Sequence, residues 1–392
     1  MNIKDSNIAI IHDWFVKKSL GGSEKVTFIL NDLLNERYST PDIFSLTSNI
    51  ESLTSRSHKT TKIKTSFIQS LPFGKTNVQS YLPILPYAIE QFDLREYDLI
   101  ISSSHALAKG VLTSPEQLHI SYVHTPMRYA WDQMNIYLKN STFSKFGFEI
   151  PIRFMLYKLR QWDFYSSQRI DYIVANSNFT SKRIKKYWGL ESDVINPPVD
   201  IKRFKYNNPR GDYYVSLNRL VPNKRVDLLI KAFNKLNLPL IIIGDGPERL
   251  KLENMSNKNI KFLRKISDKE VENYMSRCRA FVYAGIEDFG IAPVEAMASG
   301  APVIAYGKGG ILDTINCFYQ QDKEKVPNGL LFKKQTSEDI FDTISWFEDK
   351  KAWKKFNPEI LNEYSQNFSI KNFIGKFDLI INKTWEIFKK KL

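Results

Sequence analysis

Short apolar runs alternate with amphipathic stretches along most of this chain. A run of about four to eight apolar residues that ends in polar residues is typical of a buried strand, and a longer amphipathic stretch is typical of a helix. Such alternation predicts βαβ units and parallel sheets. We expect strands at 8–12, 97–102, 118–123, 172–176, 213–217, 238–243, 281–284 and 302–306, and helices at 23–35, 224–236, 268–277, 292–298 and from about 368 to the end.

One segment interrupts the alternation near the middle of the chain. Asn196-Pro197-Pro198 contains two adjacent prolines, which fit neither a helix interior nor a central strand. A chain of 392 residues also exceeds the usual size of one domain. We therefore predict an N-terminal domain over 1–196, a second domain over 197–367, and a C-terminal helix over 368–392.

The composition is that of a soluble globular protein, with 43% apolar and 25% charged residues. The longest aliphatic run, at 238–243, is far shorter than the roughly 20 residues that span a bilayer. The N-terminus lacks the pattern of a secretory signal, so we expect a cytoplasmic protein. Two cysteines and five histidines without metal-ligand spacing predict neither a disulfide framework nor a metal site, and we expect no cofactor.

The net charge of +14 predicts an acidic partner: nucleic acid, an anionic membrane or a phosphorylated substrate. The chain has no zinc-finger pattern and no RNA-binding aromatic motif. We therefore expect no nucleic-acid partner, and favour a phosphate-bearing substrate or a membrane surface.

Two glutamates flank the start of a predicted helix. Glu287 lies in the loop after the strand at 281–284, and Glu295 lies on the helix that Pro293 opens. The helix N-terminus between them offers free N–H groups to a diphosphate. Each carboxylate can also accept hydrogen bonds from two neighbouring hydroxyls of a sugar. The alternative is a solvated loop carboxylate and an unrelated glutamate on the helix surface.

Two cations follow the strand at 213–217. Arg219 and Lys224 stand five residues apart, where they can neutralise a leaving diphosphate. Alone, such cations are more often surface charges. Gly244, in Gly244-Asp245-Gly246-Pro247, predicts a tight turn after the next strand. This turn is not the GxGxxG fingerprint of dinucleotide binding.

The N-terminal half has a glycine pair between its first strand and helix. Gly21 and Gly22 let the backbone approach a phosphate closely, and Ser23 can cap the helix. A plain turn is the alternative.

Histidines also follow the predicted strands of this half. His124 comes after the strand at 118–123, although a lone histidine there is more often structural. His12 with Asp13, His105 and Arg128 are candidates for the acceptor side. For His12 and His105 the structural interpretation is favoured.

Three segments together resemble the donor-binding half of the family-4 glycosyltransferases. They are SLNRLVPNK, IIIGDGPERL and EDFGIAPVEAMASGAPVIA. Their order and mutual spacing match those of the family, and the resemblance extends over most of residues 1–370. The resemblance implies the α/β GT-B fold, in which two doubly wound Rossmann-like domains face each other across a cleft. It also implies that 1–196 is the acceptor side, that 197–367 binds the nucleotide-sugar donor, and that the C-terminal helix over 368–392 crosses back to the first domain. The segment HTPMRYAWD is similar to one in bacterial O-antigen mannosyltransferases.

The resemblance also implies roles for individual residues. Glu295 would bind the nucleotide ribose, Glu287 the hydroxyls of the donor sugar, and His124 the donor sugar from the other domain. The donor-binding residues would be Gly21, Gly22, Arg219, Lys224, Gly244, Glu287, Phe289, Gly290, Ile291 and Glu295, and the catalytic candidates His124, Glu287, Arg219 and Lys224.

The implied reaction is metal-independent hexose transfer with retention at the anomeric carbon, in lipopolysaccharide O-antigen or other surface-polysaccharide synthesis. GDP-mannose is the favoured donor, and UDP-hexoses remain open. The acceptor would be a lipid-linked or free oligosaccharide. Residues 151–162 mix aromatic and basic side chains and either contact the inner membrane or pack on the domain core. The alternatives are a sugar-nucleotide epimerase and a non-catalytic nucleotide-sugar or glycan-binding protein.

Overall fold

The structure is a computed structural model that describes residues 3–16, 21–140, 149–207, 209–264, 266–318 and 326–392. The chain divides into two compact units. Unit 1 comprises Met1–Pro197 with Phe373–Leu392, and unit 2 comprises Pro198–Asn372. The change from one unit to the other thus falls at the adjacent prolines.

The described part of unit 1 is built on an eight-stranded sheet with the order β3-β4-β2-β1-β5-β6-β7-β8. Neighbouring strands are parallel, except that β3 pairs antiparallel with β4. The central strands β1, β5 and β6 are buried along their whole length, as expected for a parallel sheet covered on both faces. The strands are β1 Ile8–His12, β2 Asp42–Ser45, β3 Ser52–Thr54, β4 Thr60–Thr65, β5 Leu99–Ser104, β6 Leu118–Val123, β7 Tyr172–Ala175 and β8 Asp193–Val194.

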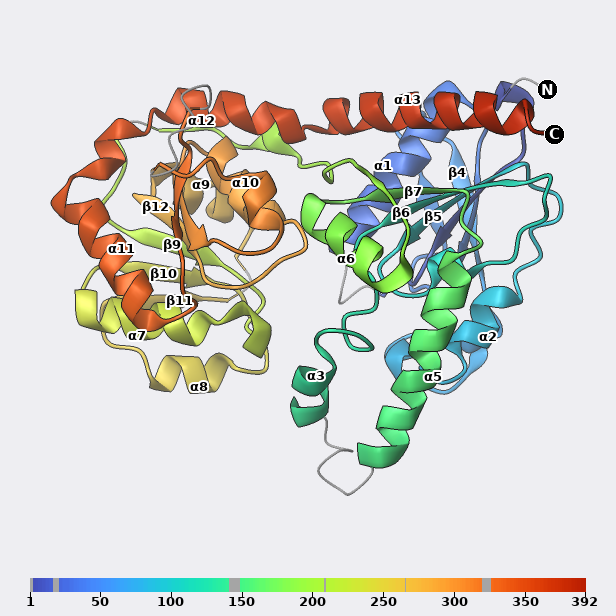
Figure 1. Ribbon diagram of the computed structural model, residues 1–392. Helices are drawn as coiled ribbons and strands as arrows, with labels where there is room; N and C mark the ends of the chain where they lie inside the picture. The colour runs from blue at the N-terminus through green and yellow to red at the C-terminus, as the bar shows by residue number, and fades with distance from the viewer. Residues whose placement is uncertain (1–2, 17–20, 141–148, 208, 265, 319–325) are drawn as a thin grey trace. The chain divides into compact units, whose positions relative to one another are not determined.

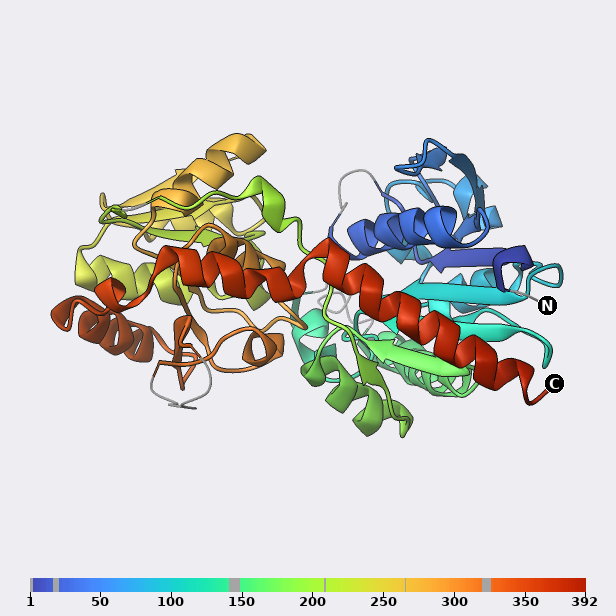
Figure 2. The same ribbon diagram turned by 90° about the horizontal axis from the view of Figure 1, so that it is seen from above.

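Helices cover both faces of this sheet, with α1 and α13 on one side and α2 and α5 on the other (Figures 1 and 2). The C-terminal helix α13 joins unit 1 through ring contacts of Phe373 and Phe377 with Tyr122, and through an ion pair of 2.5 Å between Arg37 and Asp378. The helices are α1 Gly22–Arg37, α2 Leu85–Glu90, α3 Met134–Asn140, α5 Glu149–Ser167, α6 Asn178–Trp188 and α13 Ile370–Lys389.

The described part of unit 2 has a six-stranded parallel sheet with the order β11-β10-β9-β12-β13-β14. One face packs on α7 and α11, and the other on α9 and α10. Its strands are β9 Tyr214–Leu217, β10 Leu240–Ile243, β11 Ile260–Leu263, β12 Ala280–Tyr283, β13 Val303–Tyr306 and β14 Gly329–Phe332. Its helices are α7 Val226–Leu236, α8 Arg249–Asn254, α9 Asp268–Arg277, α10 Ile291–Ala298, α11 Ser337–Asp349 and α12 Pro358–Ser365.

The predicted pair of Rossmann-like α/β domains with parallel sheets is confirmed. Several elements differ from their predictions, and the start of α7 does so for a local reason. The helix expected from Lys224 begins only at Val226, because Pro222–Lys224 forms a 3₁₀ turn and Arg225 adopts a left-handed conformation with φ of 52°. A left-handed residue cannot continue a right-handed helix, so the turn and α7 remain separate.

Candidate active site

The sequence-predicted donor residues of unit 2 gather at the carboxyl edge of its sheet. Strands β9, β10, β12 and β13 are parallel, so the loops that follow them leave from one edge. Residues 218–224 follow β9, Gly244 follows β10 and Glu287 follows β12. Ligands of open parallel sheets bind at this edge.

Glu287 and Lys224 are paired in unit 2. One carboxylate oxygen of Glu287, Oε1, accepts hydrogen bonds from Lys224 Nζ and from the Tyr283 hydroxyl. The Lys224 and Glu287 side chains are each 19% exposed, so their attraction is less screened than that of a surface pair. Lys224, which we expected at the diphosphate, is thus hydrogen-bonded to Glu287, which we expected at the donor sugar.

Two further glycines, which the sequence analysis did not single out, support the Glu287 loop. The backbone N–H of Gly310 donates to the Glu287 carbonyl at 2.8 Å. A Cβ at Gly310 would lie 2.0 Å from the Asp288 carbonyl oxygen, and Gly309 has φ of 93°. Only glycine fits this close approach. The signal was the run Gly307-Lys308-Gly309-Gly310, directly after a predicted strand.

The start of α10 presents backbone donors beside Glu287. Gly290 has φ of 98° and precedes the helix without any side-chain cap. Phe289 is buried against Phe368, with ring centroids 5.7 Å apart, so its backbone rather than its ring is available to a ligand. Glu295 lies half-buried one turn further along, after Pro293. Uncapped N–H groups and the helix dipole together favour an anion at this position.

Arg219 is exposed and makes no ion pair with the described residues. Its loop is fixed by Gly244, which has φ of 142° and at which a Cβ would lie only 1.8 Å from the Asn218 carbonyl oxygen. The turn after β10 therefore lies directly against the loop after β9. This contact holds the backbone beside Arg219 while its guanidinium stays accessible to a phosphate.

In unit 1, Asp13 is committed to the protein's own backbone. Its carboxylate accepts hydrogen bonds from the N–H groups of His105 at 2.7 Å, Ala106 at 3.2 Å, Leu107, and Ala108 at 2.8 Å. His105 Nδ1 lies 3.0 Å from the same carboxylate. Burial opposes ionisation, but the charge and hydrogen bonds of His105 outweigh it and hold the pKa of Asp13 well below its usual range. A carboxylate has about four acceptor positions. Asp13 therefore stabilises the 105–108 turn, and little capacity is left for an acceptor.

His12 and His124 belong to one buried hydrogen-bonded group. His124 Nε2 lies 2.9 Å from the Ser103 hydroxyl, and His12 Nδ1 lies 3.0 Å from the Ser103 carbonyl oxygen. The Thr27 hydroxyl is 3.0 Å from that of Ser103 and 3.1 Å from His12 Nδ1. Burial is the main cause that lowers the pKa of His12 to about 4 and the pKa of His124 well below its usual value. The charge of the nearby His105 is the second cause and acts in the same direction. Both imidazoles are therefore neutral at pH 7.

The glycine pair opens α1 in a way that differs from the predicted serine cap. The N-cap residue is Gly21, and Glu24 reaches back so that its Oε2 accepts from the Gly21 N–H at 2.8 Å and the Ser23 hydroxyl at 2.9 Å. The prediction that Ser23 caps α1 is therefore wrong, because its hydroxyl binds Glu24 instead. Arg128 is half-buried near His105. Burial and, to a smaller extent, the charge of Arg128 oppose protonation of His105, but the Asp13 carboxylate outweighs them and raises the pKa of that histidine.

Within the described ranges, no group of three or more histidine, cysteine, aspartate or glutamate residues could hold a metal ion. Among the helices described here, none is both long and apolar enough to cross a membrane.

Comparison with known proteins relates one part of the chain to a protein family. Residues 199–367 match the family described as "Glycosyl transferases group 1". This match covers nearly all of unit 2, and so includes the Lys224–Glu287 pair and the start of α10.

Relatives extend the similarity to glycosyltransferases beyond unit 2. An uncharacterized glycosyltransferase of Methanocaldococcus jannaschii is 28% identical over 277 residues, which are 69% of this chain and 71% of that protein. The alpha-1,3/1,6-mannosyltransferase ALG2 of Saccharomyces cerevisiae is 31% identical over 223 residues, but the match covers only 43% of this chain and 44% of that protein. These relatives support a glycosyltransferase, and they include mannosyltransferases.

A solved structure agrees with the fold. The Anabaena protein HepE in complex with UDP superimposes with a TM-score of 0.65, covering 96% of this chain and all of that one, at 16% identity. At this identity the likeness concerns the fold alone.

The buried histidines give the protein a testable acid sensitivity. Burial, aided by nearby charges, lowers the pKa of His119 to about 3, as it lowers those of His12 and His124. Below their ordinary pKa of 6.5, the unfolded chain binds protons at these histidines and the folded unit does not. Stability is therefore complete above pH 6.5 and falls toward pH 4, by about 1.4 kcal/mol per pH unit for each such histidine. The raised pKa of His105 acts in the opposite sense and only above pH 6.5, where the folded unit keeps a proton that the unfolded chain has lost, so it does not alter the loss below pH 6.5.

Thermal unfolding between pH 7.5 and 4.5 measures the effect. We expect His119→Gln to flatten the pH dependence. His58→Asn is the matched control, because His58 is exposed in a turn with φ of 61° that asparagine tolerates. A pH dependence equally steep in His119→Gln would contradict the assignment.

Proposed function

We propose that this protein is a retaining glycosyltransferase that moves mannose from GDP-mannose to a growing, lipid-linked bacterial surface glycan. The observation that carries the proposal is the Lys224–Glu287 pair beside the uncapped start of α10, within the matched domain. This arrangement offers a cation, a carboxylate and backbone donors at one sheet edge. The yeast relative, whose name states mannosyl transfer, supports mannose as the sugar.

In the proposed reaction the acceptor hydroxyl attacks the anomeric carbon on the same face from which the diphosphate leaves. The bond between that carbon and the phosphate oxygen breaks, the new glycosidic bond forms, and the departing phosphate oxygen takes the acceptor proton. Arg219 and Lys224 stabilise the negative charge on the diphosphate without a metal ion. Glu287 positions the sugar hydroxyls, and Glu295 binds the ribose.

The remaining donor residues act through their backbone in this proposal. Gly244, Phe289, Gly290 and Ile291 lie on the loops at the edge of the unit 2 sheet and approach the diphosphate and sugar closely. In unit 1, Gly21 and Gly22 play the same part, and neutral His124 hydrogen-bonds the donor sugar. Among the acceptor-side candidates, His12, His105 and Arg128 remain in the proposal, and Asp13 is assigned to the 105–108 turn.

A UDP-hexose is the alternative donor. The specific observation in its favour is that HepE, which shares the fold, was solved with UDP. We propose that the donor is bound largely through backbone groups. Backbone groups distinguish guanine from uracil less sharply than side chains do, so this mode of binding accepts either a GDP or a UDP donor.

A thermal-shift panel with GDP, UDP, ADP and their hexose conjugates tests the donor. We expect selective stabilisation by GDP and GDP-mannose, since a ligand that binds only the folded state raises the melting temperature. The shift should disappear in Arg219→Ala and Glu295→Ala and persist in Lys231→Ala, whose exposed lysine lies on α7. Stabilisation by UDP compounds alone would favour the alternative donor. No shift and no transfer with any donor would contradict a transferase.

The lipid-linked acceptor is supported by one face of α5. Phe154, Tyr157 and Tyr165 are exposed along this face, and Lys158 Nζ lies 5.7 Å from the Phe154 ring. The opposite face, which includes Leu156, is buried in unit 1. Aromatic and basic side chains on one helix face favour an anionic membrane surface. We place the reaction at the inner face of the cell membrane.

Vesicle sedimentation tests this placement. We expect the protein to sediment with phosphatidylglycerol vesicles at low salt and less with phosphatidylcholine vesicles. Phe154→Ser should lower the bound fraction several-fold, whereas Tyr206→Ser, which alters an exposed aromatic of unit 2, should not. Equal sedimentation of both variants would argue against a role for α5.

A further inference from the structure

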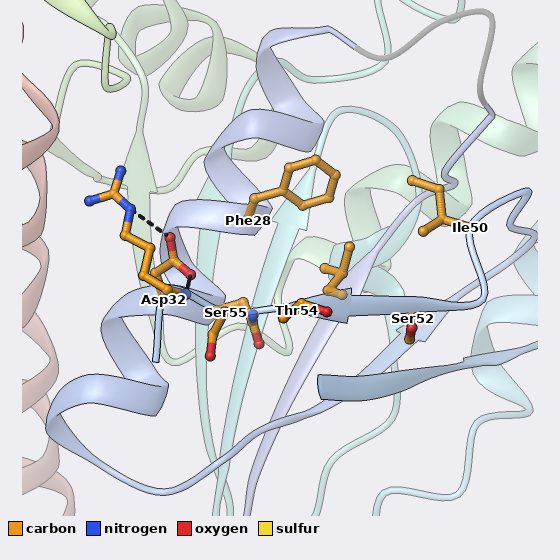
Figure 3. A pocket seen from close by; sticks show the side chains of 9 residues that line it. Phe28, Asp32, Ile50, Ser52, Thr54 and Ser55 are labelled. Atoms are coloured by element: carbon orange, nitrogen blue, oxygen red, sulfur yellow. Dashed lines mark hydrogen bonds and ion pairs between the residues drawn. The ribbon is translucent and has the colours of Figure 1, made fainter. Parts of the chain in front are cut away.

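A pocket in unit 1 lies between α1 and the segment 50–56, which includes the edge strand β3 (Figure 3). The cavity measures about 400 Å³. This is within the usual range for small-molecule sites, of about 300–1,000 Å³. It is lined by Phe28, Asn31, Asp32, Ile50, Ser52, Leu53, Thr54, Ser55 and Arg56.

The lining combines an aromatic ring with uncharged polar groups. Phe28 projects from α1 toward β3, the strand along which Thr54 and Ser52 lie (Figure 3). Asn31 is only 1% exposed, and its side-chain N–H groups donate to none of the described residues. The only charges in the lining are those of Asp32 and Arg56, which cancel.

The polar end of the pocket is held in place by its own hydrogen bonds. The Arg56 backbone N–H donates to Asp32 Oδ1 at 2.9 Å, and Arg56 Nε lies 3.3 Å from Asp32 Oδ2. The Arg56 side chain is 58% exposed, so part of its guanidinium remains available to a ligand. A paired carboxylate and guanidinium supply adjacent acceptors and donors, which suit two neighbouring hydroxyl groups.

Aromatic contacts connect the pocket to the histidines of unit 1. The Phe28 ring stacks on Phe15 with centroids 5.9 Å apart, and Phe15 contacts the His12 ring at 4.7 Å. His12 ends β1, where acceptor-side residues are proposed. The ring contacts from Phe28 to Phe15 and from Phe15 to His12 therefore connect the pocket to the carboxyl end of β1.

We infer that this pocket is an acceptor subsite that binds one neutral sugar residue of the glycan, set back from the residue that receives the new sugar. The inference rests on the proposed function. A nucleotide or phosphate does not suit the pocket, because Asp32 neutralises the charge of Arg56, the one cation among the lining residues. A pyranose does, since its C–H face can pack on Phe28 while its hydroxyls meet Asn31, Asp32 and Ser52.

Direct binding of α-linked mannotriose and of maltotriose by the full chain, followed by NMR or calorimetry, tests the subsite. We expect at least one trisaccharide to bind, and methyl α-mannoside to bind more weakly. Phe28→Ala should weaken binding at least tenfold. Ser52→Tyr should do the same by filling the pocket from β3, where tyrosine suits a strand. Phe67→Ala, which alters an exposed aromatic elsewhere in unit 1, should bind as the wild type does.

Kinetics separates this inference from the function on which it rests. With transfer established, Phe28→Ala should raise KM for an oligosaccharide acceptor at least tenfold and leave kcat and the donor KM unchanged. Active enzyme without that change, or trisaccharide binding equal in wild type and Ser52→Tyr, would overturn the subsite and leave the transferase intact. Trisaccharide binding that depends on Phe28, in a protein that transfers no sugar, would support the pocket and refute the transferase. Failure of both trisaccharides to bind would overturn the subsite.

Discussion

Lys224→Ala is expected to lower kcat about 10²–10³-fold, the loss typical of removing one preorganised electrostatic contact at a developing charge. The variant removes a cation proposed to stabilise the leaving diphosphate, and it also takes from Glu287 its partly buried partner. Loss of transition-state stabilisation should lower kcat and kcat/KM together. Steady-state transfer assays with the donor found by thermal shift measure the effect.

Glu287→Gln separates the two parts of this pair. Glutamine keeps an oxygen that can accept from Lys224 and Tyr283 but removes the negative charge. Hydrogen bonds to charged groups contribute about 1.5–3 kcal/mol, so we expect kcat to fall by roughly ten- to a hundredfold. The product should keep its anomeric configuration, because Glu287 positions the sugar and does not attack it. Full turnover in this variant would refute the positioning role, and Lys231→Ala serves as the control for both variants.

The strands buried on both faces were the most predictable part of the fold. β1 and β6 coincide with their expected ranges, because a fully buried strand appears in the sequence as an unbroken apolar run. β4, with the sequence TTKIKT, and the three-residue β3 were missed, because they are largely polar; β3 is the edge strand of the sheet and β4 lies beside it. Their position nevertheless creates the pocket beside α1.

The residues of the donor site were predictable from motifs, but their contacts were not. Lys224 and Glu287 are 63 residues apart, and only the parallel pairing of β9 with β12 brings their loops together. The contacts of Asp13 were likewise not predictable from the sequence. In the sequence it resembles a candidate for acceptor binding, whereas in the fold its carboxylate is occupied by a turn more than 90 residues away.

Asp13→Ala is expected to destabilise unit 1 by about 3–5 kcal/mol, the cost of removing one partner from a buried ion pair. The carboxylate is fully buried, and its loss would leave the N–H groups at 105–108 and the side chain of His105 without their acceptor. Buried donors without partners keep their full desolvation cost. Urea unfolding followed by tryptophan fluorescence measures the change, and Trp14 reports locally because its ring meets His105 at 4.6 Å.

Two further variants decide whether the hydrogen bonds or the charge of Asp13 matter more. Asp13→Asn keeps one acceptor oxygen but turns an amide N–H₂ toward backbone donors, so it should recover only part of the lost stability. Asp93→Ala removes an exposed aspartate of the same unit, paired only with Arg95, and should leave the urea midpoint unchanged. Equal midpoints for wild type and Asp13→Ala would show that the 105–108 turn does not depend on this carboxylate. Asp13 would then return to the acceptor side as a group free to bind substrate.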